Sequence, residues 1–156
     1  MKIALASDHG GYNLKGMIKN YLEQDGLLFE DLGSYDLEKV DYPDFTLKVA
    51  EGVARGDFSK GIVVCSTGLG VSMVCNKVPG IRAALCGDCF SARYSREHND
   101  ANILALGERV TGPGLALSIV EVFLYTRFQG GRHQRRIDKI AEIEKKYSSA
   151  REVFSG

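Results

Sequence analysis

The 156-residue sequence has no surplus of charge of either sign and no long hydrophobic run. Twenty Lys and Arg balance 20 Asp and Glu, whereas a protein that binds nucleic acid through bulk charge is usually basic. No apolar stretch reaches the roughly 18 residues that a membrane span needs. The apolar run after Met1 ends before the roughly 7–15 residues of a signal-peptide core. These absences predict a cytoplasmic protein without a membrane segment.

Tryptophan is absent, and only three prolines and four cysteines occur. Cys86 and Cys89 form a C-x-x-C pair, but the sequence has no second pair and no closely spaced histidine pair that would complete a zinc site. We therefore expect reduced thiols and no metal site. Glycine, by contrast, is frequent at 18 residues, which indicates tight turns and close approaches of the backbone to other groups.

Apolar runs alternate with segments of helical periodicity. The runs cover residues 2–7, 27–32, 61–65, 81–86 and 102–106. All but the second lack polar alternation, as do strands that are buried on both faces of a parallel sheet. This pattern predicts an α/β fold, a three-layer, doubly wound sandwich with a five-stranded parallel sheet. We expect one domain over residues 1–147 and a C-terminal tail over residues 148–156.

The helix expected at residues 113–128 is apolar on nearly all sides between residues 115 and 125. Such a helix is buried on more than one side. We expect it to form a homodimer interface, and a central core helix is the alternative.

Two polar segments follow strands, where sheets of this type bind ligands. The first is Ser7-Asp8-His9-Gly10-Gly11, in which helix capping would explain Asp8 but not His9. In the second, Cys65 is followed by a small-residue loop, residues 66–70, that leads into a helix. Backbone N–H groups there can bind an anion and lower a thiol pKa. A buried strand-end cysteine is the alternative, and the partial G-x-G-x-x-G match is weak evidence for a dinucleotide.

Two further segments are candidates for the site, one with a histidine and one with two arginines. His98 lies in the polar stretch 95–102, before the fifth strand. That is the wrong end for its own subunit's pocket, so His98 is either a surface residue or part of a neighbouring subunit's pocket. Arg132 and Arg136 are four residues apart on one helical face, which suits a phosphate monoester. A solvated basic face and a small RNA-binding patch are the alternatives.

Together these motifs resemble the type B ribose-5-phosphate isomerases, the family that also holds bacterial galactose-6-phosphate isomerase subunits. The matching segments occur in family order over about residues 2–147, and they are residues 7–11, 41–44, 65–70, 76–83, 95–102, 107–109 and 130–133. The resemblance implies a Rossmann-like fold and a homodimer, in some members a tetramer. It also implies no metal or cofactor, and active sites that two subunits share.

The resemblance also implies individual roles. Cys65 matches the base that moves a proton between C1 and C2 of the open-chain sugar, and Thr67 and His98 match residues linked to ring opening, with His98 coming from the partner subunit. The backbone of residues 66–70 matches the loop that holds the enediolate, with Ser66, Gly68 and Gly70 among its residues. The sugar-hydroxyl contacts correspond to Asp8, Tyr42 and Asn99. The phosphate contacts correspond to His9, Arg132 and Arg136, with Arg109 as a further one from the partner subunit.

The sequence departs from this family at two places. Ser66 stands where glycine is usual, and it would be strained if its φ were positive. Met73-Val74-Cys75 is bulkier than the usual residues. The expected activity is cofactor-free interconversion of D-ribose 5-phosphate and D-ribulose 5-phosphate, a step of the pentose phosphate pathway. The alternatives are an isomerase of a six-carbon sugar phosphate (allose 6-phosphate or galactose 6-phosphate) and, from another class, a nucleotide- or RNA-binding module.

Overall fold

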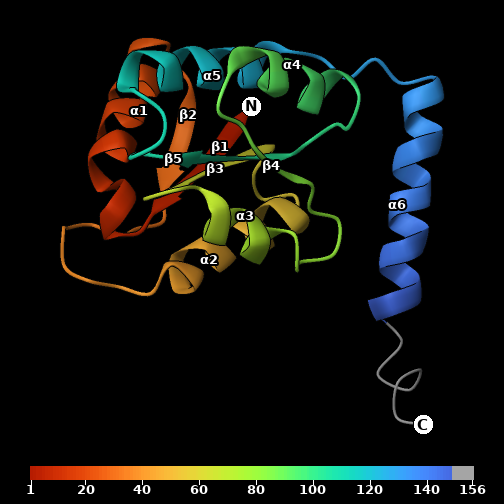
Figure 1. Cartoon of the computed structure of the whole chain (residues 1–156), viewed down its shortest axis with the longest axis horizontal. Helices are drawn as coiled ribbons and strands as arrows, with labels where there is room; N and C mark the ends of the chain where they lie inside the picture. Colours follow the sequence, from red (N-terminus) through yellow and green to blue (C-terminus); the bar gives the residue numbers. More distant parts are fainter. Residues whose placement is uncertain (149–156) are drawn as a thin grey trace, which may run out of the picture.

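The computed structural model describes residues 1–148, which form a five-stranded parallel sheet in the order β2-β1-β3-β5-β4 (Figure 1). The strands are β1 (Lys2–Ser7), β2 (Leu28–Asp31), β3 (Lys60–Cys65), β4 (Ala83–Leu85) and β5 (Ile103–Gly107). In the register of the sheet, Ser7 pairs with Val64, and Cys65 pairs with Gly107. The carboxyl ends of the three central strands therefore meet at one edge, and the predicted fold is confirmed.

Helices cover both faces of the sheet. The short η1 (His9–Gly11) leads into α1 (Tyr12–Gln24), which shares one face with α4 (Cys89–Glu97) and α5 (Pro113–Tyr125). The other face carries α2 (Tyr42–Ala54) and α3 (Leu69–Cys75) (Figure 1). Each face has its own apolar core. Among residues 1–148, no helix combines the length and apolar composition that a membrane crossing requires.

α6 (Arg132–Ser148) lies to one side of this sandwich (Figure 1). The tail was expected to start at residue 148, but Ser148 is the last residue of α6. The rest of the expected tail, residues 149–156, lies outside the described residues.

Two sequence-based expectations about burial meet different outcomes. β4 is not buried on both faces as its apolar run predicted, because it is an edge strand of the sheet, and its Leu85 is 40% exposed. α5 buries Ile119 and Phe123 completely within the chain, whereas Leu115 and Tyr125 stay exposed. The helix therefore contributes to the core of its own chain, and its place in a homodimer interface stays a prediction.

A buried lysine joins the sheet to the end of α5. The Nζ atom of Lys60 donates hydrogen bonds to the carbonyl oxygens of Phe123 (3.1 Å) and Leu124 (2.7 Å). These carbonyls belong to the last turn of α5, where the helix itself offers no donors. Burial, with a smaller contribution from the charge of Arg96, lowers the pKa of Lys60 to about 8.

The lowered pKa of Lys60 predicts a pH dependence of stability. Between pH 8 and 10.5, the unfolded chain holds the Lys60 proton while the folded chain releases it. The free energy of unfolding from this group therefore rises with pH across that window. We expect the free energy of unfolding of Lys60→Met to lack this rise. Urea unfolding at several pH values measures the difference in free energy of unfolding between wild type and variant. Lys139→Met changes a lysine on the exposed surface of α6 and should keep the rise. Equal slopes of the free energy of unfolding against pH in all three proteins would contradict the prediction.

Candidate active site

The loop between β3 and α3 folds back over the Cys65 sulfur. Gly68 precedes α3 with φ of 78°, and its backbone N–H donates to Cys65 Sγ at 3.1 Å. A side chain at Gly68 would meet both this strained conformation and the Leu106 backbone, since a Cβ there would lie 2.9 Å from the Leu106 carbonyl carbon. Glycine is thus required at the position that brings the amide to the sulfur.

The segment at the end of β5 is hydrogen-bonded to this loop. The backbone N–H groups of Glu108 and Arg109 donate to the carbonyl oxygens of Cys65 (2.9 Å) and Ser66 (3.0 Å). Gly107 has no room for a side chain, because a Cβ would lie 2.5 Å from the Thr67 backbone. The backbone of Arg109 therefore lies beside the cysteine loop of its own chain, and the contribution of its side chain to the partner subunit's site stays a prediction.

The segment after β1 lies next to the same loop. Asp8 caps η1, as the capping interpretation predicted, and its side chain accepts from the Gly10 N–H at 2.9 Å. Gly10 leaves space that Ser66 uses, because a Cβ on Gly10 would lie 2.2 Å from Ser66 Oγ and 3.3 Å from Asp8 Oδ1. His9 is held by its Nδ1, which accepts from the Val40 N–H at 3.3 Å.

Tyr42 packs against the loop at Gly70, since a Cβ on Gly70 would lie 2.6 Å from the Tyr42 ring. We call the residues at this edge of the sheet the cysteine cluster: Asp8, His9, Tyr42, Cys65, Ser66, Thr67, Gly68, Gly70 and Arg109. The structure thus brings together nine of the thirteen residues that the sequence singled out.

The other four lie at the opposite end of the sheet. His98 is stacked on His133 with ring centroids 4.0 Å apart and an interplanar angle of 10°, and its other neighbour is Tyr94 at 4.6 Å. His133 belongs to the first turn of α6, which also carries Arg132 and Arg136. We call His98, Asn99, Arg132, His133 and Arg136 the histidine cluster.

His133 is a residue to which sequence reasoning gave no role. Its side chain is buried, and neither ring nitrogen has a hydrogen-bond partner among the described residues. Burial lowers the pKa of His133, and the neighbouring His98, Arg132 and Arg136 lower it further. The ring therefore favours the neutral form, in which it can stack on His98 without charge repulsion.

A single chain does not unite the two clusters. Cys65 is the last residue of β3 and His98 precedes β5, and these strands are parallel neighbours. The clusters thus lie at the carboxyl and amino ends of the same sheet. Cys65 is only 5% exposed, and five cavities among residues 1–148 have neither Cys65 nor Arg132 or Arg136 in their lining. Within one chain, the sulfur and the two arginines therefore lie apart.

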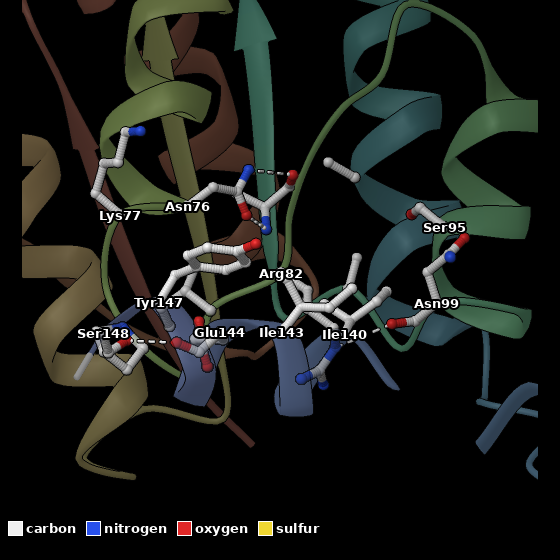
Figure 2. A pocket seen from close by; sticks show the side chains of 15 residues that line it. Asn76, Lys77, Arg82, Ser95, Asn99, Ile140, Ile143, Glu144, Tyr147 and Ser148 are labelled. Atoms are coloured by element: carbon white, nitrogen blue, oxygen red, sulfur yellow. Dashed lines mark hydrogen bonds between the residues drawn. The ribbon is translucent and has the colours of Figure 1, made fainter. Parts of the chain in front are cut away.

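A cavity of about 770 Å³ lies instead between α6 and the segment around β4 (Figure 2). Ile140, Ile143 and Tyr147 of α6 line it together with Arg82 and Asn99. Of the residues singled out in the sequence, it contains only Asn99. The signal in the sequence was the spacing of the three apolar residues, which places them on one face of an otherwise charged helix.

The remaining cysteines and the departures at the loop have simple explanations. All four cysteines are unpaired, and burial raises the pKa of the Cys75 thiol to about 12. Ser66 is not strained: among residues 1–148, Asp100 is the only non-glycine residue with positive φ. Met73 is 62% exposed, so its bulk points outward. Within the same range, no three His, Cys, Asp or Glu side chains group closely enough to hold a metal ion.

Comparison with known proteins identifies the family. The model of the Ribose/Galactose Isomerase family matches residues 3–140. The putative sugar phosphate isomerase YwlF of Bacillus subtilis is 51% identical over 147 residues, which are 94% of this chain and 99% of that protein. Ribose-5-phosphate isomerase B of Escherichia coli is 44% identical over 145 residues, with 93% and 97% covered.

Solved structures agree over nearly the whole chain. Ribose-5-phosphate isomerase B of Clostridium thermocellum has a TM-score of 0.93 and 61% identity, covering 94% of this chain and 99% of that one. The enzyme of Mycoplasma genitalium, solved with bound ribulose-5-phosphate, has a TM-score of 0.88 and 43% identity, with 92% and 96% covered. The resemblance read from the motifs is confirmed: the chain is an isomerase that belongs to the Ribose/Galactose Isomerase family.

Proposed function

We propose that this chain interconverts D-ribose 5-phosphate and D-ribulose 5-phosphate without a cofactor, in active sites that two copies of the chain build together. The observation that carries the proposal is the Cys65 sulfur, which accepts the Gly68 N–H at 3.1 Å beside Asp8, Ser66 and Tyr42. The homologues named ribose-5-phosphate isomerase B, at 44–61% identity, support the five-carbon substrate.

Ring opening comes first in the proposed reaction. The furanose of the aldose opens when its C1–O4 bond breaks, O4 gains a proton and the C1 hydroxyl loses one. His98 and Thr67 serve this proton transfer, with His98 supplied by the second copy. A positioned side chain within hydrogen-bond reach of the transferred proton accelerates such a step.

Isomerisation follows on the open chain. The Cys65 thiolate removes the proton from C2, and the electrons move to the C1 carbonyl oxygen to give an enediolate. Backbone N–H groups of the loop stabilise the developing negative charge. The C2 hydroxyl proton passes to O1, and the Cys65 thiol returns the carbon-bound proton to C1, which leaves the ketone at C2. Asp8, Tyr42 and Asn99 hold the sugar hydroxyls in this scheme.

The phosphate is bound at the far end of the substrate. In the proposed site, His9 and Arg109 of the cysteine cluster meet Arg132 and Arg136 of the second copy's histidine cluster. Arg132 and Arg136 lie in the first two turns of α6, near the helix N-terminus, where the helix dipole also favours a dianion. The binding energy acts away from the reacting carbons and orients them.

Exposed apolar side chains near the cysteine loop support the association of two copies. Leu69 (51% exposed), Met73 (62%), Leu85 (40%) and Phe90 (72%) belong to α3, β4 and α4. Leu69 and Met73 share α3, and Leu85 also approaches Gly68. Apolar side chains exposed together are typical of a surface that another chain covers. A homodimer is the simplest assembly that covers it, and a tetramer of such dimers would keep the same sites.

Mixing two inactive variants tests the shared site. Cys65→Ala and His98→Asn each disable the sites of their own homodimer. A mixed dimer has one site with both substitutions and one site with neither. After dissociation and reassociation, we expect about a quarter of wild-type activity to return, because half of the dimers are mixed and each has one intact site. Activity that stays absent in a sample whose mixed dimers are shown by mass spectrometry would contradict the shared site.

The substrate is tested by an isomerase assay across sugar phosphates. We expect kcat/KM to be highest for D-ribose 5-phosphate among the aldose phosphates tested. A higher value for allose 6-phosphate or galactose 6-phosphate would assign the chain to six-carbon substrates instead. Nucleotide titration in the same buffer separates catalysis from a nucleotide-binding role.

A further inference from the structure

The turn that carries His98 contains the one non-glycine residue with positive φ among residues 1–148. α4 ends at Glu97, His98 is its C-cap, and the chain turns through Asn99 and Asp100 before β5 begins. Asp100 has φ of 45°, in the left-handed region that side chains rarely adopt. Something outside the turn must hold this conformation, and we call residues 98–101 the Asp100 turn.

Arg82, in the segment before β4, binds the turn through hydrogen bonds. Its Nε donates to the carbonyl oxygens of Asn99 (3.0 Å) and Asp100 (3.1 Å). Its Nη2 donates to the Asp100 carbonyl oxygen (2.9 Å) and to Asp100 Oδ2 (3.2 Å). One planar guanidinium group thus binds two successive carbonyls and the carboxylate, which fixes the turn in orientation as well as in place.

Arg96 of α4 binds the turn through the other carboxylate oxygen of Asp100. Its Nη1 donates to Asp100 Oδ1 at 2.7 Å and to the carbonyl oxygen of Ala101 at 2.6 Å. Its side chain is only 10% exposed and lies against Phe123 of α5. Because such a side chain cannot move far, Arg96 ties the Asp100 turn to the core of the domain.

We propose that Arg82 and Arg96 are positioning residues for His98 and act through Asp100. The inference rests on the proposed function, in which His98 opens the sugar ring in the second copy's site. His98 sits between Tyr94 and His133, and these rings limit its tilt. They do not fix the backbone from which it projects. The two arginines supply that restraint, so their loss displaces the imidazole without removing it.

Arg82→Met is the first test, with three readouts. On D-ribose 5-phosphate, we expect kcat to fall roughly 10- to 100-fold, because displacing a catalytic group by about 1 Å costs about that much. On an aldopentose 5-phosphate without the 4-hydroxyl group, which cannot close a furanose ring, kcat should stay within about 3-fold of wild type, because no ring has to be opened. Exchange of the C1 proton of D-ribulose 5-phosphate in deuterium oxide needs Cys65 but no ring opening, and it should persist.

Controls separate positioning from general damage. Arg93→Met removes an exposed arginine from α4, the helix that carries Arg96, and should leave all three readouts at wild-type values. If Arg82→Met does not fold, Asp100→Ala takes its place, because it removes both carboxylate contacts. Asp100→Asn should restore ring-closed activity, since asparagine tolerates positive φ and keeps a side-chain oxygen.

The outcomes are distinct. Selective loss on the ring-closed substrate, with proton exchange kept, supports the inference. An equal loss in all three readouts, or no loss in any of them, overturns it. Failure of the proposed function appears in the wild-type protein itself, which would then show neither isomerisation nor exchange, and the inference would fall with it.

Discussion

Cys65→Ala should reduce kcat for sugar phosphate isomerisation by about 10²–10⁴-fold, the range that a positioned general base contributes. In the proposed reaction, the Cys65 thiolate takes the proton from carbon. Its sulfur accepts the Gly68 amide at 3.1 Å, which prepares the position for negative charge. Alanine removes the base but leaves the loop amides, so substrate binding should persist.

Calorimetric titration with D-ribulose 5-phosphate measures the binding that Cys65→Ala keeps, and proton exchange at C1 measures the step that it loses. Cys89→Ala is a suitable control, because Cys89 is half-buried at the start of α4 and belongs to neither cluster. A Cys65→Ala protein with nearly normal kcat would show that another group is the base. Cys75 is a poor substitute, since burial raises its pKa to about 12.

Arg132→Ala combined with Arg136→Ala should raise KM by about 100-fold or more, because each charge-assisted hydrogen bond contributes roughly 1.5–3 kcal/mol. Both arginines are exposed on the first turns of α6. Their removal should therefore leave the folded chain intact. kcat at saturating substrate should change less than KM, since the phosphate lies away from the reacting carbons.

Arg135→Ala is the matched control for the double variant. It removes one exposed arginine of the same helix, and with it the same charge, at a position that has no role in the proposed site. Inhibition by inorganic phosphate offers a second readout, and it should weaken in the double variant in step with KM. An unchanged KM would move the phosphate site elsewhere and leave Arg132 and Arg136 as a solvated basic face.

The pattern of apolar runs predicted the sheet because central parallel strands must be apolar on both sides. β1, β3 and β5 follow that rule closely, as their residues are buried almost throughout. The run at residues 81–86 predicted the same for β4 and was wrong, since position at an edge depends on strand order. Strand order follows from long-range pairing, which local hydrophobicity does not encode.

The motifs predicted which residues gather around Cys65 because the carboxyl ends of neighbouring parallel strands meet at one edge. They did not predict that Ser66 would be relaxed while Asp100 takes the left-handed conformation. Nor did they predict the burial of His133. Each of these depends on contacts between segments far apart in the chain, such as Arg82 with Asp100 and His98 with His133.

The sequence by itself determined the fold class, the isomerase family and the residue types of the candidate site, because periodicity and short motifs are local properties of the chain. The sequence also placed His98 before the fifth strand, away from the end that carries Cys65, but only the tertiary structure decided that β3 and β5 are adjacent and that His98 stacks on His133. The physical reason is that a local pattern gives the place of a residue relative to its own strand, whereas strand order and the packing of α6 depend on contacts between segments far apart in the chain. Because Cys65 and His98 are separated by the length of these parallel strands, the complete site that we propose requires the ends of two different chains to meet.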